Sequence, residues 1–172
     1  MKHLIILMLL MLSAACGWQL RGSVALPAGV KQMHLSSEDP YNPMMTELRQ
    51  RLLAAGVELT PAPLGAPYTL AITEQNRDSR VAAVGADSLA SAYEVTLEVR
   101  YDILGPTGEA VALDLSSSVT RSYESDVSVA GAGAREEAML LEEMRTELAQ
   151  QILRRLQAEI NAAEAVRRQP DS

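Results

Sequence analysis

Cys16 is the only cysteine of the 172-residue chain and the residue with the most distinctive chemistry. It follows the small residues Ser13–Ala15, which in turn follow nine apolar residues, Leu4–Leu12, and a basic start at Lys2. A basic start, a short apolar core and small residues before a cleavage site are typical of a secretory signal peptide. A membrane-spanning helix needs about 20 apolar residues, so this run is too short to be an anchor. We therefore predict a signal peptide over residues 1–15.

The position of Cys16 favours acylation over the other fates of a single thiol. One cysteine cannot form an internal disulfide, which leaves a free thiol, an intermolecular bridge or a lipidated N-terminus. An ordinary cut after Ala15 is the alternative to a lipobox, whose leucine (Leu12) lies one place further upstream than usual. Each methylene of an acyl chain that is buried in the bilayer contributes about 0.8 kcal/mol to membrane binding, and two or more acyl chains anchor a protein stably. We predict a Cys16 lipid anchor, directed to the outer membrane because Gly17 is not the aspartate associated with inner-membrane retention.

The composition of the mature chain argues against nucleic-acid binding and catalysis. Removal of 15 residues leaves 172 − 15 = 157, enough for one domain with a core. Without Lys2 the charge is 14 − 22 = −8, which is unfavourable for phosphate contacts on nucleic acid. The mature chain keeps one histidine, His34, and one lysine, Lys31. We find no nucleophile, metal-ligand or phosphate-loop motif, and expect no enzyme, metal or cofactor. An enzyme built on carboxylates alone is the residual alternative.

The first half of the mature chain predicts a strand, a helix and a second strand. Val30–Ser36 alternates, with Met33 and Leu35 on one face and His34 on the opposite, solvent-facing side. A helix should begin at Asn42 as N-cap and end at Gly56, with the core stripe Met45, Leu48, Leu52 and Ala55. Val57–Thr60 adds a brief extended piece. The strand that starts at Tyr68 turns polar beyond Glu74, as expected for a strand that leaves the core.

The second half predicts a long hairpin and a long helix. Residues 92–104 alternate strictly between apolar and polar side chains, and Gly105–Gly108 closes a hairpin. The return strand places Val111, Leu113, Leu115, Val119 and Tyr123 on one face. A helix from about Ala134 to Ala162 carries the stripe Leu141, Met144, Leu148, Ile152, Leu156 and Ile160.

These elements predict an α+β fold of two layers. Two helices should pack on one face of a four-stranded, mostly antiparallel sheet, because each strand has one apolar and one polar face. A single domain should extend over residues 16–165 with an N-terminal lipid tether, followed by a disordered tail over residues 166–172. Long strands on a small core also leave sheet edges open to strand addition by a partner.

The residues after the cysteine carry a family resemblance. Cys16-Gly17-Trp18-Gln19-Leu20-Arg21 resembles the mature start of the LPS-assembly lipoprotein LptE family. The similarity continues through Leu26-Pro27, Asp39-Pro40 and the stretch Leu48–Leu59, and through Tyr93, Arg121-Ser122 and Glu143-Met144. The resemblance implies an outer-membrane lipoprotein that plugs the lumen of the LptD β-barrel, takes part in lipopolysaccharide transport and assembly, and can bind lipopolysaccharide.

Candidate contact residues follow from this resemblance and from charge. Arg77, Arg80 and Arg121 are candidates for lipopolysaccharide phosphates, since arginine forms charge-assisted bonds to phosphate. The family's basic positions near strand ends align with glycine here, near Gly85 and Gly133. The alternative is that the arginines do not bind lipopolysaccharide and only keep the surface hydrated or face the barrel wall.

Trp18, Leu20 and Arg21 are candidates for contact with the barrel rim or the lipid interface, the alternative being a tether that packs on the domain. Two rival functions remain at this point. A periplasm-facing lipid carrier or transporter accessory without a barrel partner would need a sizeable apolar cavity. A lipid-anchored hydrolase would need a convergent catalytic cluster.

Overall fold

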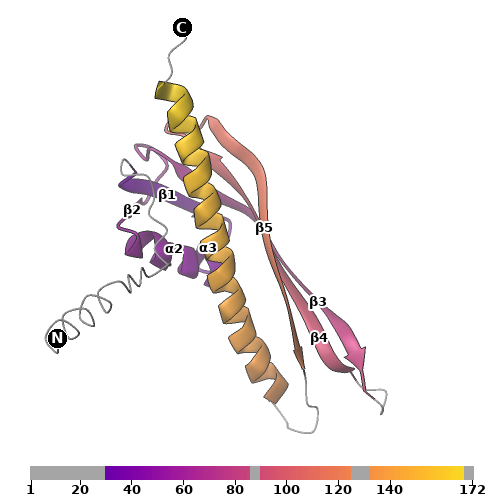
Figure 1. Cartoon of the computed structure of the whole chain (residues 1–172). Helices are drawn as coiled ribbons and strands as arrows, with labels where there is room; N and C mark the ends of the chain where they lie inside the picture. The colour runs from indigo at the N-terminus through magenta and orange to yellow at the C-terminus, as the bar shows by residue number, and fades with distance from the viewer. Residues whose placement is uncertain (1–29, 86–89, 125–131, 169–172) are drawn as a thin grey trace, which may run out of the picture.

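The computed structural model describes residues 30–85, 90–124 and 132–168 of the chain. Its elements are, in order, β1 (Gln32–Ser37), α2 (Pro43–Ala54), β2 (Glu58–Thr60), β3 (Thr69–Val84), β4 (Ala90–Leu104), β5 (Ala110–Glu124) and α3 (Ala132–Arg168). The strands form one sheet in the order β2-β1-β3-β4-β5, and the helices lie on one side of it (Figure 1). The predicted two-layer α+β class is confirmed.

The prediction of four mostly antiparallel strands is wrong, because the sheet has five strands and is mixed. The piece after the first helix is strand β2, and it pairs in parallel with β1, with Gln32 opposite Glu58. β1 also pairs in parallel with β3, while β3–β4 and β4–β5 are antiparallel. The physical reason is the crossover through α2, which returns the chain to the end of the sheet where it began, so that the next strand runs in the same direction.

Both ends of α2 are fixed by the capping residues that the sequence predicts. The Asn42 side chain accepts a hydrogen bond from the Met45 N–H at 2.9 Å, and Pro43 occupies the first turn. At the other end Gly56 has φ +80°, and the Val57 N–H donates to the Leu52 carbonyl, which is the pattern of a Schellman motif. The buried stripe is Met44, Met45, Leu48 and Leu52. Ala55, expected in that stripe, is exposed because the helix has already ended there.

Helix α3 covers the sheet with the predicted stripe and is longer than expected. All six stripe residues from Leu141 to Ile160 are buried, in one core cluster with the apolar face of β4 and with α2. The helix runs to Arg168, so the beginning of the predicted disordered tail is helical. Its last turn is held by Arg167, which donates to Glu109 at 2.8 Å and lies 6.0 Å from the centre of the Tyr68 ring. Residues 169–172 lie outside the described residues.

A β-bulge in β5 displaces one residue expected in the core. Tyr101 pairs with Leu115 but Ile103 pairs with Ala112, so Leu113 and Asp114 together oppose Asp102. Asp114 has φ 52°, a left-handed conformation, and its N–H donates to the Asp102 carboxylate at 2.8 Å. The extra residue shifts the alternation, and Leu113 is therefore 55% exposed instead of buried.

Candidate functional site

The three arginines predicted to contact lipopolysaccharide come from β3 and β5, and they lie on two different faces of the sheet. Arg77 is opposite Leu97 and Arg121 is opposite Val95, so both share the apolar, helix-facing side of β4. Arg80 is opposite Glu94 on the other side. Alternation along a strand separates them, because residues three apart point in opposite directions. The structure thus brings Arg77 and Arg121 to one side and leaves Arg80 alone.

Each of these arginines already has an acidic partner. Arg77 pairs with Glu137 and Arg121 with Glu147, both on α3. Arg80 donates from Nε to Glu94 at 2.8 Å. The arginine side chains are about half exposed or more, and pairs of this kind contribute only about 0–1 kcal/mol. An incoming phosphate could therefore replace a carboxylate at low cost.

Two tyrosines lie beside the Arg77–Glu137 pair. Tyr93 and Tyr123 face each other across β4 and β5 and stack with ring centres 5.5 Å apart. Burial, and then the neighbouring Glu137 carboxylate, raise the pKa of the Tyr123 phenol. The arrangement supplies a phenol, a guanidinium and a carboxylate on the helix-facing side, near the start of α3.

The opposite side of β3, β4 and β5 carries polar side chains, and no described element lies over it (Figure 1). We call it the polar face. Its charged residues are Glu74, Asp78 and Arg80 on β3, Glu94, Glu98, Arg100 and Asp102 on β4, and Asp114 and Glu124 on β5. The acidic residues outnumber the arginines, so this face is an electronegative surface. On β5 it also carries an exposed hydroxyl row, Ser116, Ser118, Thr120 and Ser122.

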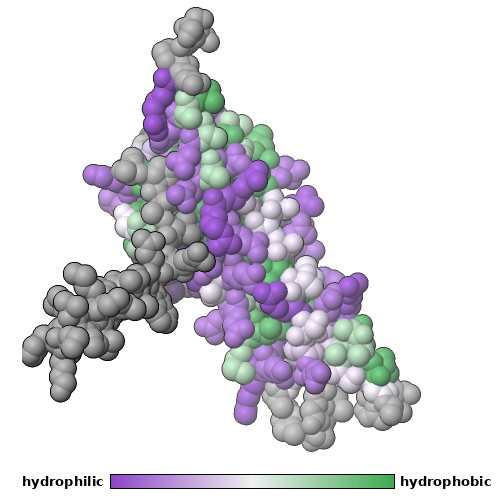
Figure 2. Space-filling model, in the orientation of Figure 1, coloured by the Kyte–Doolittle hydropathy of each residue, from purple (hydrophilic) through white to green (hydrophobic). Residues whose placement is uncertain are grey.

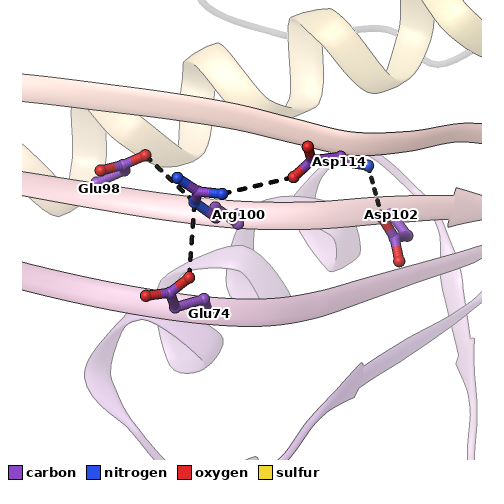
Figure 3. A network of polar contacts seen from close by, with 5 residues as sticks. All are labelled: Glu74, Glu98, Arg100, Asp102 and Asp114. Carbon is purple, nitrogen blue, oxygen red and sulfur yellow. Dashed lines mark hydrogen bonds and ion pairs between the residues drawn. The ribbon is translucent and has the colours of Figure 1, made fainter.

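Arg100 is the centre of a charge network on the polar face (Figure 3). Its guanidinium lies 3.5 Å from Glu74, 3.6 Å from Glu98 and 3.6 Å from Asp114. Asp114 reaches Arg100 because the bulge re-aims it, a common use of bulges. One cation therefore links all three long strands. The sequence places Arg100 on the polar side, but no signal in it predicts the bulge partner Asp114.

His34 lies on the same side of the sheet as the polar face, as its alternation predicts. It is half-buried, and its Nδ1 is 2.9 Å from the Thr60 carbonyl, which requires Nδ1 to carry the hydrogen. This contact ties β1 to the end of β2 and gives His34 a structural role. Among the described residues no cluster of three or more His, Cys, Asp or Glu could hold a metal ion.

The predicted tether residues Cys16, Trp18, Leu20 and Arg21 lie outside the described residues. Within the described part of the chain, none of the helices is sufficiently long and apolar to cross a membrane.

Comparison with known proteins identifies the family. A family model described as "LptE: Lipopolysaccharide-assembly" matches residues 30–156, most of the chain. The chain belongs to the LptE family. The resemblance noted in the sequence is thereby confirmed. The chain is also 29% identical to the LPS-assembly lipoprotein LptE of Photorhabdus laumondii, over 94% of this chain and 90% of that protein. It is 27% identical to the Yersinia enterocolitica protein of the same name, over 95% and 80%.

Solved structures agree with this LptE membership at the level of the fold. The rare lipoprotein B of Shewanella oneidensis is similar with a TM-score of 0.69 and 25% identity, covering 77% of this chain and 98% of that one. A lipoprotein B of Nitrosomonas europaea gives a TM-score of 0.70 at 21% identity, covering 85% and 94%. The second match shows the LptE-like fold alone.

Proposed function

We propose that the chain is an outer-membrane lipoprotein, acylated at Cys16, that acts as plug and assembly partner of the LptD β-barrel in lipopolysaccharide transport and assembly. The observation that carries the proposal is membership of a lipopolysaccharide-assembly family over residues 30–156. Its relatives in Photorhabdus and Yersinia are named LPS-assembly lipoproteins. The role is binding and positioning, not catalysis.

The surface of the domain supports a site inside a barrel better than a site on a lipid. The lumen of a large barrel is polar, and the polar face offers charged and hydroxyl side chains over three long strands. A hollow of about 490 Å³ on this face is lined by polar side chains, among them Asn76, Asp78 and Glu98. A lipid carrier would need a sizeable apolar cavity, whereas the buried apolar side chains of the sheet and both helices form one core cluster here.

Co-purification from the native membrane tests the proposal. The full-length chain with a C-terminal affinity tag is expressed in its own cells, and the proteins that elute with it are identified. We expect a large β-barrel in a fixed ratio, released only under denaturing conditions. Recovery of the lipoprotein alone, or with an inner-membrane transporter, contradicts the plug and favours the carrier. A Cys16→Ser variant serves as the control for acylation, and should lose the acyl chains.

Lipopolysaccharide contact is a separate part of the proposal, and it rests on Arg77 and Arg121. Both are on the helix-facing side with exchangeable carboxylate partners. The double variant Arg77→Ala/Arg121→Ala should weaken binding of purified lipopolysaccharide roughly tenfold or more, as charge-assisted bonds of about 1.5–3 kcal/mol are lost. Arg154→Ala, an exposed arginine of α3, is the matched control and should bind normally. Equal binding by all three proteins would remove these arginines from the contact.

A further inference from the structure

A groove lies at the end of the sheet where the chain enters it. His34, Thr69 and Leu104 are neighbours across β1, β3 and β4, so the starts of β1 and β3 and the end of β4 meet at this end. The groove has a volume of about 420 Å³ and opens on the same side as the polar face. We call it the entry groove. It is lined by His34, Ser36, Pro63, Leu64, Thr69, Ala71, Leu104 and the turn Gly105–Gly108.

The lining of the entry groove differs from the polar face beside it. The described residues that form it include no Asp, Glu, Lys or Arg. Its floor contains the small residues Ser36 and Ala71, and its walls are the Pro63-Leu64 segment and the turn at Pro106. Leu64 is 92% exposed, although it lies next to this hollow. A groove with no Asp, Glu, Lys or Arg in its lining, and with Leu64 exposed beside it, is suited to a peptide segment that has few charges.

The N-terminal segment of this chain has the matching chemistry. Residues 17–29 contain a single charged residue, Arg21, together with the apolar residues Trp18, Leu20, Val24 and Leu26. The segment continues directly into Val30, which is buried, and Lys31, whose carbonyl accepts the Glu58 N–H at 2.8 Å. The point where the segment joins the domain is thus fixed at the same end of the sheet as the groove.

The length of the segment is sufficient. Trp18 is 30 − 18 = 12 residues from Val30, which in extended form spans up to about 40 Å. The groove lines the end of the sheet where Val30 enters, so the segment can reach it with residues to spare. A tryptophan side chain buries about 150–250 Å² and is the strongest apolar anchor in the segment.

We propose that this N-terminal segment, residues 17–29, is a tether that docks in the entry groove. Trp18 and its apolar neighbours would then lie against Leu64 and against the groove residues of β1 and β3. Because Trp18 is close to Cys16 in the sequence, docking brings the end of the sheet that contains the entry groove close to the acylated Cys16. The far ends of β3 and β4, and the start of α3, are then the parts of the domain farthest from Cys16. The docked tether sets the orientation of the domain relative to its lipid anchor, and this inference does not depend on the barrel partnership.

Trp18 is itself the reporter that tests the proposal, since it is the only tryptophan of the chain. The mature chain, residues 16–172 with Cys16→Ser, is measured in solution without membranes. We expect blue-shifted Trp18 emission and protection from acrylamide, both independent of protein concentration. Emission and quenching equal to those of free tryptophan amide would overturn the proposal. Dependence on protein concentration would also overturn it, in favour of docking on a second copy.

Groove variants show where Trp18 lies. Leu64→Ser, at an exposed position that folding does not need, should lower the ratio of docked to free tether roughly tenfold. The emission should shift towards that of free tryptophan. Ala71→Gln, which fills the floor, should do the same, with circular dichroism as a check of folding. Leu53→Ser, an exposed leucine of α2 outside the groove, is the matched control. An unchanged spectrum in both groove variants would place Trp18 elsewhere and contradict the proposal.

Discussion

At the scale of single residues, alternation along the strands decides which charges can act together. The sequence correctly places Arg100 and Glu98 on the solvent side of the long strand, and correctly gives His34 the side opposite Met33. It does not show which acid each arginine meets, because those partners come from α3 and from neighbouring strands. Arg77 and Arg80 look like one basic cluster in the sequence, yet the structure puts them on opposite faces.

Among the described residues other than glycine, Asp114 is the one with a positive φ, and this conformation restricts substitution. Its φ of 52° is tolerated by Asp and Asn but unfavourable for β-branched residues. Asp114→Val should therefore lower the free energy of unfolding by about 1–3 kcal/mol, measured in urea, whereas Asp114→Asn should cost less. Ser116→Val is the matched control, on the same strand and face beyond the bulge. If Asp114→Val proved as stable as the control, the bulge would not constrain this position.

At the scale of elements, periodicity predicts most of the fold. The apolar side chains of β4 recur every two residues and those of α3 every three or four residues. These are the side chains that the core buries, so the sequence predicts both elements correctly. The sequence does not identify β2 as a paired strand, because three residues carry too little pattern to define one. The sequence does not predict the bulge in β5. The extra residue changes which side chains of β5 face the core without changing how many apolar residues the strand contains.

The buried stripe of α3 should account for much of the domain's stability. Leu148 is buried in the middle of the stripe, facing the sheet and α2. Leu148→Ala should lower the free energy of unfolding by about 2–5 kcal/mol, since it removes apolar contacts and leaves a cavity. Met139→Ala, on the same helix but 62% exposed, should change it by less than about 0.5 kcal/mol. Similar urea midpoints for the two variants would show that α3 does not pack as described.

The last turn of α3 should be sensitive to acid through Glu109. Hydrogen bonds from Thr107 and the nearby Arg167 hold the pKa of the Glu109 carboxyl below its usual value of 4.5. A lowered pKa in the folded state stabilises the contact at neutral pH, and this contribution is lost as the pH falls through and below 4.5. The protection of amides near Arg167 against hydrogen exchange, relative to the intrinsic exchange rate at the same pH, should therefore decrease in acid.

Glu109→Gln is the control for this pH effect. The variant should exchange faster than the wild type at neutral pH, and the difference should vanish in acid, where Glu109 is protonated. A difference that persists unchanged below pH 4.5 would show that the carboxylate does not hold the turn.

At the scale of the whole molecule, the two sides of the sheet have different tasks. One side forms the core with α2 and α3, and hydrophilic side chains cover much of the outer surface of α3 (Figure 2). The other side presents the polar face. The sequence predicts this division, because each long strand has one apolar face. The sequence pattern does not identify the partner, because a hydrophilic surface can bind many different partners. Only the family match points to lipopolysaccharide assembly.

Site-specific photo-crosslinking from the polar face tests the central claim most directly. A photoreactive amino acid at Ser118, an exposed position of the hydroxyl row, is introduced into the full-length lipoprotein in living cells. The account predicts a crosslink to a large outer-membrane β-barrel that mass spectrometry identifies as LptD. A crosslinker at Ser118 that reacts only with water, lipid or an inner-membrane transporter would contradict it.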